Sequence, residues 1–344
     1  MTEKNSELGF WGKLRRPVFV LAPMVDVTDC AFRQIINKYG KPDVFWTEFV
    51  SADGLAHPEA REELMVDLEY SAGEHPIVAQ IFGGNAENMK IASALCRELG
   101  FDGVDINMGC PDRSIEKCAA GAAMIKNPEL ARKIIRAAKE GAGDLPVSVK
   151  TRIGYNKNEI ETWVRELLSE DIAVLTVHLR TRKEMSDVPA RWDLMKRVVE
   201  IRDEMKKETL ILGNGDAVDL ADAKQKVEES GCDGVMLGRA IFGNPWLFAP
   251  LKNSSTLLHP AGGTFRLQNF SREPTIQEKL KVMVEHTKLF EKILGGRKNF
   301  AIMKKHYKAY VNGFDGAKDL RAKLMEAGTA NQVEAITNDF LNGI

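Results

Sequence analysis

The chain has 344 residues, of which 44% are hydrophobic and 28% charged, and its formal net charge is −1. These values indicate a folded protein with a large buried core and exclude a disordered chain or a uniformly basic nucleic-acid coat. No apolar stretch approaches the roughly 20 residues of a membrane helix, and residues 1–16 lack the apolar core of a signal peptide. The five cysteines include no CxxC pair, which disfavours a disulfide framework or a zinc site. We therefore expect a cytoplasmic protein with no membrane contact and no bound metal.

Short apolar runs alternate with amphipathic stretches along most of the chain. The predicted strands are residues 18–21, 44–47, 77–82, 104–107, 147–150, 174–178, 210–214 and 234–238. The predicted helices between them include residues 85–99, 128–139, 159–169, 194–206 and 219–229. Eight strands with following helices favour an α/β fold, a closed (β/α)8 TIM barrel. An open doubly wound sheet is the alternative, which is disfavoured because no GxGxxG motif follows the first strand.

The barrel pattern ends near residue 250 and a helical pattern resumes at residue 275. We predict an N-terminal extension (1–16), a barrel domain (17–250), a linker rich in Ser, Thr, Gly and Pro (251–274) and a smaller all-helical domain (275–344). Between residues 279 and 310, nine Lys and Arg stand against two Glu, a local charge of +7. Aromatic residues interleave with this charge, as they do both on nucleic-acid-binding surfaces and in ordinary helix cores. The sequence leaves these two interpretations open.

Two glycine-containing turns follow the last two predicted strands, at residues 213–216 and 238–239. Functional groups of a TIM barrel gather at the carboxyl ends of its strands, where such turns commonly bind phosphate. Arg239 adds a guanidinium group suited to a phosphate. We therefore expect a phosphorylated ligand or cofactor at this position.

Four further polar residues lie within predicted strands or in the turns that follow them. Lys150 is a candidate Schiff-base nucleophile or a cation beside an anionic cofactor. The alternative is a lysine whose side chain only extends to solvent at the barrel mouth. His178 is either a functional group or a hydrogen-bonded core histidine. Gln80 offers the donor and the acceptor that recognition of a heterocycle requires. Cys110, in a Gly-Cys-Pro turn, is a candidate nucleophile or proton donor.

Several motifs in this order resemble those of the flavin-dependent tRNA-dihydrouridine synthases. In the barrel they are Ala22-Pro23-Met24, Asn107-Met108-Gly109-Cys110-Pro111, Gly121-Ala122, Val149-Lys150-Thr151-Arg152, Thr176-Val177-His178, Arg180-Thr181-Arg182, Asn214-Gly215-Asp216 and Gly238-Arg239-Ala240. In the helical region they are Lys304-Lys305-His306, Tyr310, Gly316-Ala317 and Leu320-Arg321. The resemblance extends from about residue 17 to residue 326.

The resemblance implies an FMN-dependent enzyme that reduces the C5=C6 bond of uridines in tRNA, with NADPH as the electron donor. By motif, the cofactor would be bound by Pro23, Met24, Val25, Gln80, Lys150, His178, Asn214, Gly215, Asp216, Gly238 and Arg239. Asn107, Arg180, Arg182, Lys183, Lys304 and Lys305 would contact the tRNA. We expect the protein to be a monomer.

The resemblance further implies that Cys110 protonates C5 of uracil as hydride reaches C6. Asp112 in the same turn is a poor donor near pH 7, because an unperturbed aspartate has a pKa of about 3.9. Cys118 is the alternative donor and is expected to pack against the barrel instead. The sequence departs from the family pattern at Val25, Leu179 and Cys118, which bears on the pocket shape and on the target position in tRNA.

Three other functions compete with this interpretation. A flavin barrel acting on a free small molecule, such as a dihydroorotate-type enzyme, does not explain the basic helical region. A Schiff-base aldolase that uses Lys150 predicts a colourless protein. A non-catalytic tRNA-binding module needs neither Lys150 nor Cys110.

Overall fold

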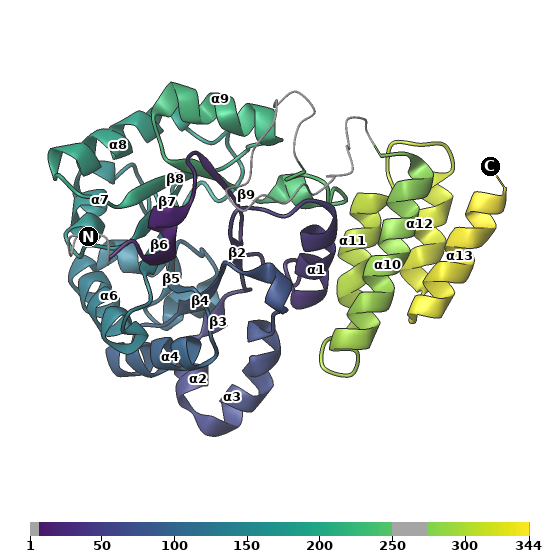
Figure 1. Ribbon diagram of the computed structural model, residues 1–344, viewed down its shortest axis with the longest axis horizontal. Coiled ribbons are helices and arrows are strands. Elements are labelled where there is room, and N and C mark those ends of the chain that lie inside the picture. Colours follow the sequence, from purple (N-terminus) through teal and green to yellow (C-terminus); the bar gives the residue numbers. More distant parts are fainter. Residues whose placement is uncertain (1–6, 250–273, 344) are drawn as a thin grey trace, which may run out of the picture. The chain divides into compact units, whose positions relative to one another are not determined.

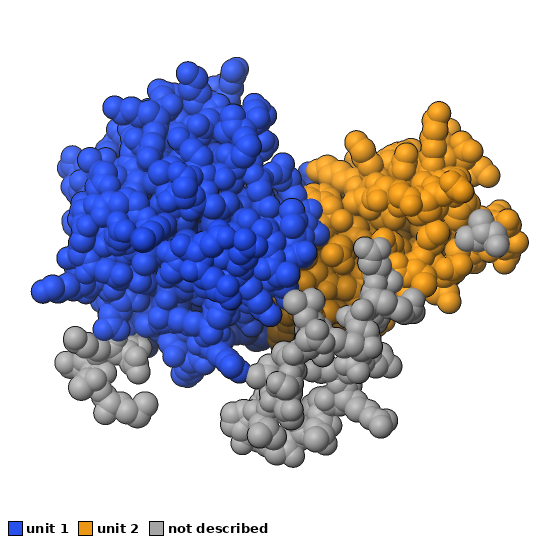
Figure 2. Space-filling view, turned by 90° about the horizontal axis from the view of Figure 1, so that it is seen from above, with its two compact units in different colours: residues 1–30, 43–240 blue, residues 31–42, 241–344 orange. Residues whose placement is uncertain are grey.

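The computed structural model describes residues 7–249 and 274–343. The predicted linker, apart from its last residue, lies outside the described residues. The chain divides into two compact units, residues 1–30 with 43–240 and residues 31–42 with 241–344 (Figure 2). Within the described part of the chain, no helix has both the length and the apolarity to cross a membrane.

The first unit is a parallel β-barrel whose strands follow the order β1-β9-β8-β7-β6-β5-β4-β2. A parallel bridge between Val20 and Val44 joins the first strand to the segment before β2 and brings the two ends of the sheet together. The extra strand β3 pairs with β4. The strands are β1 (Val18–Leu21), β2 (Phe45–Trp46), β3 (Val50–Ser51), β4 (Ile77–Phe82), β5 (Gly103–Met108), β6 (Val147–Arg152), β7 (Val174–His178), β8 (Leu210–Asn214) and β9 (Gly234–Leu237). The predicted TIM-barrel fold is confirmed.

Helices surround the strands of this unit (Figure 1). Several of them begin at a polar cap, as at Asn85, whose side chain accepts hydrogen bonds from two backbone amides of the first turn. Helices α4 and α6 pack closely, because a Cβ atom at Gly141 would lie 2.0 Å from the carbonyl oxygen of Lys90. The helices are α2 (Ala52–Ala56), α3 (Pro58–Leu64), α4 (Ala86–Glu98), α5 (Arg113–Lys117), α6 (Pro128–Ala142), α7 (Ile160–Leu168), α8 (Met195–Glu204) and α9 (Leu220–Ser230).

The N-terminal segment forms part of the barrel core. A short 3₁₀ helix, Gly9–Lys13, buries Trp11 against Trp46 of β2, with 5.6 Å between the ring centroids. Leu8 and Trp11 belong to a cluster of buried side chains from the amino-terminal ends of several strands. Leu8 and Trp11 therefore contribute to the barrel core, although both lie in the predicted N-terminal extension.

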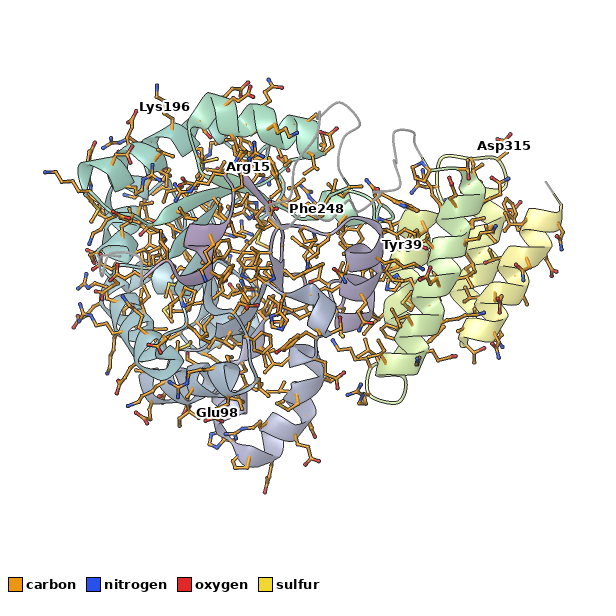
Figure 3. All side chains as sticks on the ribbon, in the orientation of Figure 1. Arg15, Tyr39, Glu98, Lys196, Phe248 and Asp315 are labelled. Carbon is orange, nitrogen blue, oxygen red and sulfur yellow. The ribbon has the colours of Figure 1, made fainter. Side chains whose placement is uncertain are left out.

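The second unit is helical and includes a helix from the barrel region of the sequence. Residues 31–42, which contain most of α1 (Cys30–Tyr39), group with the C-terminal helices and not with the barrel. Phe32 stacks on His286 with 4.8 Å between the ring centroids. Tyr39, labelled on α1 in Figure 3, donates from its hydroxyl to Glu285 at 2.6 Å. The sequence predicted a barrel domain of residues 17–250, whereas α1 belongs to the helical unit. The other helices are α10 (Ile276–Leu294), α11 (Met303–Tyr310), α12 (Ala317–Glu326) and α13 (Ala330–Asn342).

Two buried histidines lie in the core of the helical unit. The rings of His286 and His306 are 4.5 Å apart, and no described residue bonds their nitrogens. Burial, with a smaller effect of Lys305, lowers the pKa of His306 to about 3, and burial holds the pKa of His286 well below its usual value. Both rings are therefore neutral at pH 7. Of the residues Lys304, Lys305 and His306 that resemble a family motif, only Lys305 is exposed.

Candidate active site

A pocket of about 220 Å³ lies at the carboxyl ends of the barrel strands. It receives side chains from β6 and β7 and from the segments that follow β1, β7, β8 and β9. Most of the predicted cofactor residues line it, namely Pro23, Met24, Lys150, His178, Asn214, Gly215, Asp216, Gly238 and Arg239. Val25 and Gln80 do not, since Val25 is exposed to solvent and Gln80 is fully buried. Ser186 lines the pocket but was not predicted.

The turn after β8 has a backbone that requires glycine. Gly215 adopts a φ of +130°, and a Cβ atom there would lie 2.7 Å from the side chain of Ala190. Asn214 fixes the turn to the next strand by donating from its amide to the carbonyl oxygen of Met236 at 2.8 Å. Gly215, predicted as part of a phosphate-binding turn, therefore allows the turn after β8 to lie close to the segment that contains Ala190.

Asp216 lies between two guanidinium groups at this turn. Arg180 donates to one of its carboxylate oxygens and Arg239 to the other, and the backbone amide of Ala190 donates at 2.8 Å. Partial burial works against ionisation, but the hydrogen bonds from Arg180 and Ala190 keep the pKa of Asp216 below its usual value. With Lys150, the pocket thus holds three cations and one carboxylate, a net charge that suits a phosphate dianion.

His178 is a neutral hydrogen-bond acceptor in this pocket. Its Nε2 atom lies 3.1 Å from Nη1 of Arg180. A guanidinium group can only donate, so Nε2 accepts and the proton of the neutral ring resides on Nδ1. Burial, together with the charges of Lys150 and Arg152, lowers the pKa of His178 well below its usual value. The histidine therefore does not add charge to the pocket at pH 7.

Lys150 is a cation with a depressed pKa. Burial and the charge of Arg152 lower its pKa to about 8, while the negative charge of Asp105 acts in the opposite direction. Lys150 is thus protonated for the most part at pH 7 and deprotonates within a range accessible to experiment.

A line of polar side chains crosses the barrel interior beside Lys150. On β5, Asp105 accepts hydrogen bonds from Ser148 Oγ at 2.5 Å and from Gln80 Nε2 at 2.6 Å. Gln80 accepts in turn from Asn107 Nδ2 at 3.1 Å. The other end of the Asn107 amide accepts from the backbone amides of Gly109 and Cys110, at 3.1 and 2.9 Å. Both ends of the Gln80 amide are thus hydrogen-bonded within the barrel, and its contact with a cofactor ring stays a prediction.

Cys110 is held half-buried in the turn after β5. Burial raises the pKa of its thiol, so that the sulfur is protonated at neutral pH. Arg152 supports the same turn by donating from Nε to the carbonyl oxygen of Gly109 at 2.8 Å. Cys118 is exposed and donates to the carbonyl oxygen of Ser114, so the expectation that it packs against the barrel is wrong. Among the described residues, no group of three or more His, Cys, Asp or Glu side chains could hold a metal ion.

Comparison with known proteins agrees with this arrangement. The sequence profile of the dihydrouridine synthase (Dus) family matches residues 20–343. The chain belongs to the dihydrouridine synthase family. The predicted family and enzyme class are therefore confirmed.

Two bacterial relatives match this family member along almost its whole length. A protein of Staphylococcus aureus (strain Mu50 / ATCC 700699), named "Probable tRNA-dihydrouridine synthase", is 39% identical over 333 residues, 96% of this chain and 95% of that protein. The "Probable tRNA-dihydrouridine synthase 2" of Bacillus subtilis (strain 168) is 38% identical over 333 residues, 96% of each chain.

Two solved structures share the fold of this dihydrouridine synthase family member at low sequence identity. A 2-naphthoyl-CoA reductase complex has a TM-score of 0.51 at 10% identity and covers 68% of this chain and 50% of that one. The 6-hydroxypseudooxynicotine amine oxidase of Pseudomonas geniculata N1 has a TM-score of 0.50 at 13% identity, covering 67% and 46% of the two chains.

The residues predicted to contact tRNA differ from one another in their exposure to solvent. Arg180 is 2% exposed and lines the pocket, and its contact with tRNA stays a prediction. Arg182 is half-buried and forms an ion pair with Glu116. Lys183 and Lys305 are exposed, and Lys304 is half-buried.

Three further polar residues belong to this site although their sequence pattern did not indicate it, namely Asp105, Ser148 and Arg152. Asp105 and Ser148 face each other in the β5–β6 register, and Arg152 ends β6. A signal was present, because a charged residue within a short apolar strand requires a buried partner. The partner itself becomes visible only when the strands are paired.

Proposed function

We propose that the protein reduces the C5=C6 bond of uridines in tRNA to give 5,6-dihydrouridine, with bound FMN and with NADPH as the electron donor. The observation that carries this proposal is a cationic pocket, with Lys150 at its edge, near the protonated thiol of Cys110. Lys150 pairs with Asn107 in the register of β6 with β5, and the Asn107 side chain accepts from the backbone amide of Cys110 at 2.9 Å, which brings Lys150 and the Cys110 turn close together. Membership of the dihydrouridine synthase family and the names of the relatives support the same reaction.

The pocket residues fit FMN. Arg239 and Arg180, with the turn at Gly215, provide donors and positive charge for the ribityl phosphate. Lys150 provides a cation beside the flavin ring, where it would stabilise the negative charge of the reduced flavin. When bound, FMN supplies the hydride for this reduction.

Cys110 acts as the general acid in this proposal. Hydride addition at C6 of uracil leaves negative charge on C5 and O4, and the Cys110 thiol transfers its proton to C5. The raised pKa of the thiol keeps that proton available at neutral pH. The thiolate that remains is stabilised by the positive charges of Lys150 and Arg152. Asn107 acts on this step indirectly, because its side chain holds the Cys110 turn.

The tRNA is bound by the basic surface of the helical unit. Exposed lysines on α10 and α11, such as Lys281, Lys292 and Lys308, provide charge for the phosphate backbone. The target uridine must leave its stack to reach the mouth of a barrel, as in other enzymes that act on bases. This surface favours a tRNA substrate over a free small molecule.

The decisive test compares two cysteine variants of the purified protein. Denaturation should release FMN from the parent protein, from Cys110→Ala and from Cys118→Ala alike. With NADPH and unmodified tRNA, we expect Cys110→Ala to lose about 10²–10⁴-fold in dihydrouridine formation, as is typical for loss of a general acid. Cys118→Ala, the matched control, should retain its rate. Release of no flavin, or a defect in Cys118→Ala with none in Cys110→Ala, would refute the proposal.

A further inference from the structure

A polar relay links a buried carboxylate to the Cys110 turn. It consists of Asp105, Gln80 and Asn107, and it ends at the backbone amides of Gly109 and Cys110. Asp105 and Gln80 are both 0% exposed, and Asn107 is 6% exposed. Water therefore has little access to replace any of these bonds.

The two ends of the relay have opposite hydrogen-bonding character. The backbone amides at the Cys110 turn can only donate, so the Asn107 carbonyl oxygen must face them. The Asn107 amide nitrogen then needs an acceptor, which is the carbonyl oxygen of Gln80. The Gln80 amide nitrogen needs an acceptor in turn, and the carboxylate of Asp105 supplies it. The direction of both side-chain amides is consistent only if position 105 accepts.

We propose that Asp105 is a positioning residue for Cys110: its carboxylate terminates the relay that orients Gln80 and Asn107 and so holds the Cys110 turn. The inference rests on the proposed function, in which Cys110 delivers the proton. Asp105 itself touches neither the thiol nor the reacting atoms in this scheme.

The surroundings of Asp105 indicate why a charged residue is kept inside the barrel. A buried carboxylate is unfavourable unless donors and a nearby cation compensate it. Burial raises the pKa of Asp105 to about 6, while the hydrogen bonds from Ser148 and Gln80 and the charge of Lys150 favour its ionised form. If the position served packing alone, an apolar side chain of similar size would be at least as stable. The acceptor is therefore the property that the relay requires.

Two substitutions at position 105 separate the acceptor from the charge. Asp105→Asn removes the charge and keeps an oxygen that can face Gln80, while the new amide group can donate to Ser148. Asp105→Leu removes both the charge and the acceptor at a similar side-chain size. Any effect of lost charge on Lys150 or Cys110 is common to the two variants, so a difference between them reports the acceptor.

The readout is the rate at which iodoacetamide alkylates Cys110 at pH 7.5 in the full-length protein, followed by mass spectrometry. The exposed Cys118 is replaced by serine in every sample. We expect Asp105→Leu to react about tenfold faster, because loss of a buried acceptor loosens the turn and exposes the thiol. Asp105→Asn should stay within about twofold of the parent. Equal rates in the two variants would overturn the proposal.

A second variant keeps the proposal testable if Asp105→Leu does not fold. Gln80→Glu places two carboxylates side by side, which must share a proton to preserve the relay. Its alkylation rate relative to the parent should rise with pH as that proton is lost. Adding Asp105→Asn should abolish the rise. The carboxylate at position 80 then accepts from the amide at position 105 and needs no shared proton. A rise that persists in the double variant would contradict the proposal.

These rates do not depend on the proposed reaction, since alkylation needs neither NADPH nor tRNA. Dihydrouridine formation measured on the same samples should fall in Asp105→Leu and be maintained in Asp105→Asn. If the parent protein forms no dihydrouridine, the proposed function fails while the alkylation comparison still decides whether Asp105 holds the turn.

Discussion

Lys150 is the side chain whose charge state most affects the pocket. It lies among Arg152, Arg180 and Arg239, and the carboxylate of Asp105 offsets their effect on its pKa only in part. Burial is the main cause of its depressed pKa of about 8. In the unfolded chain a lysine has a pKa of about 10.4, so the native state binds this proton less readily than the unfolded state does.

This difference predicts how Lys150→Met changes the stability of the protein freed of cofactor. Below pH 8 the lysine is protonated in both states, and burial of its charge lowers the free energy of unfolding by the full amount. That contribution shrinks between pH 8 and about 10.4 and is absent above. We expect Lys150→Met to raise the free energy of unfolding by about 1–3 kcal/mol at pH 7, and by much less at pH 10.5.

Urea unfolding followed by circular dichroism at both pH values measures this effect. Lys183→Met, at an exposed position after β7, serves as the control and should change stability little at either pH. A gain for Lys150→Met that is the same at pH 7 and pH 10.5 would show that burial of the charge is not its cause.

At the scale of single elements, the N-terminal 3₁₀ helix shows how a short segment can contribute to a barrel. Trp11 is 1% exposed and packs on Trp46, whereas the neighbouring Phe10 is only partly buried. Residues 9–13 have too few positions to show a helical or strand periodicity, so the sequence pattern carried no signal for this element.

The burial of Trp11 predicts a large stability difference between adjacent positions. Trp11→Ala should lower the free energy of unfolding by about 3–5 kcal/mol, because a large buried side chain leaves a cavity that the β-strands cannot fill. Phe10→Ala should cost clearly less. Chemical unfolding of both variants provides the measurement, and equal losses would indicate that the segment does not insert into the core.

At the scale of the whole molecule, the two units are interleaved in the sequence. The helix α1 follows β1, yet its side chains pack with α10 and α11. Phe32 is 0% exposed within this helical unit. A cut between the barrel and the C-terminal helices therefore does not separate two self-sufficient domains.

We predict that a chain ending at residue 249 does not give a stable monomeric barrel. It would expose the face of α1 that Phe32 buries against His286 and His306, and such exposed apolar surface promotes aggregation. Size-exclusion chromatography and thermal unfolding, compared with the full-length chain, test this. A monomeric truncated protein that unfolds at the same temperature as the full-length protein would contradict it.

The strands other than the two-residue β3 could be predicted because burial on both faces of a parallel strand leaves a short apolar run. Most of the pocket could also be placed, since the carboxyl ends of all barrel strands meet at one mouth. The partners of individual polar groups could not. Gln80 and Asp105 are 25 residues apart, and their hydrogen bond follows from the register of β4 with β5, which local patterns do not specify.

The sequence by itself determined the fold, the family and the set of strand-end residues, because these depend on periodicity and on motifs within short segments. The tertiary structure decided what each buried face packs against and which polar atoms pair. The amphipathic pattern of a helix such as α1 predicts that one face is buried, but it does not predict which element covers that face. A buried carboxylate such as Asp105 requires donors, and only the assembled barrel brings Ser148 and Gln80 within hydrogen-bonding distance of it.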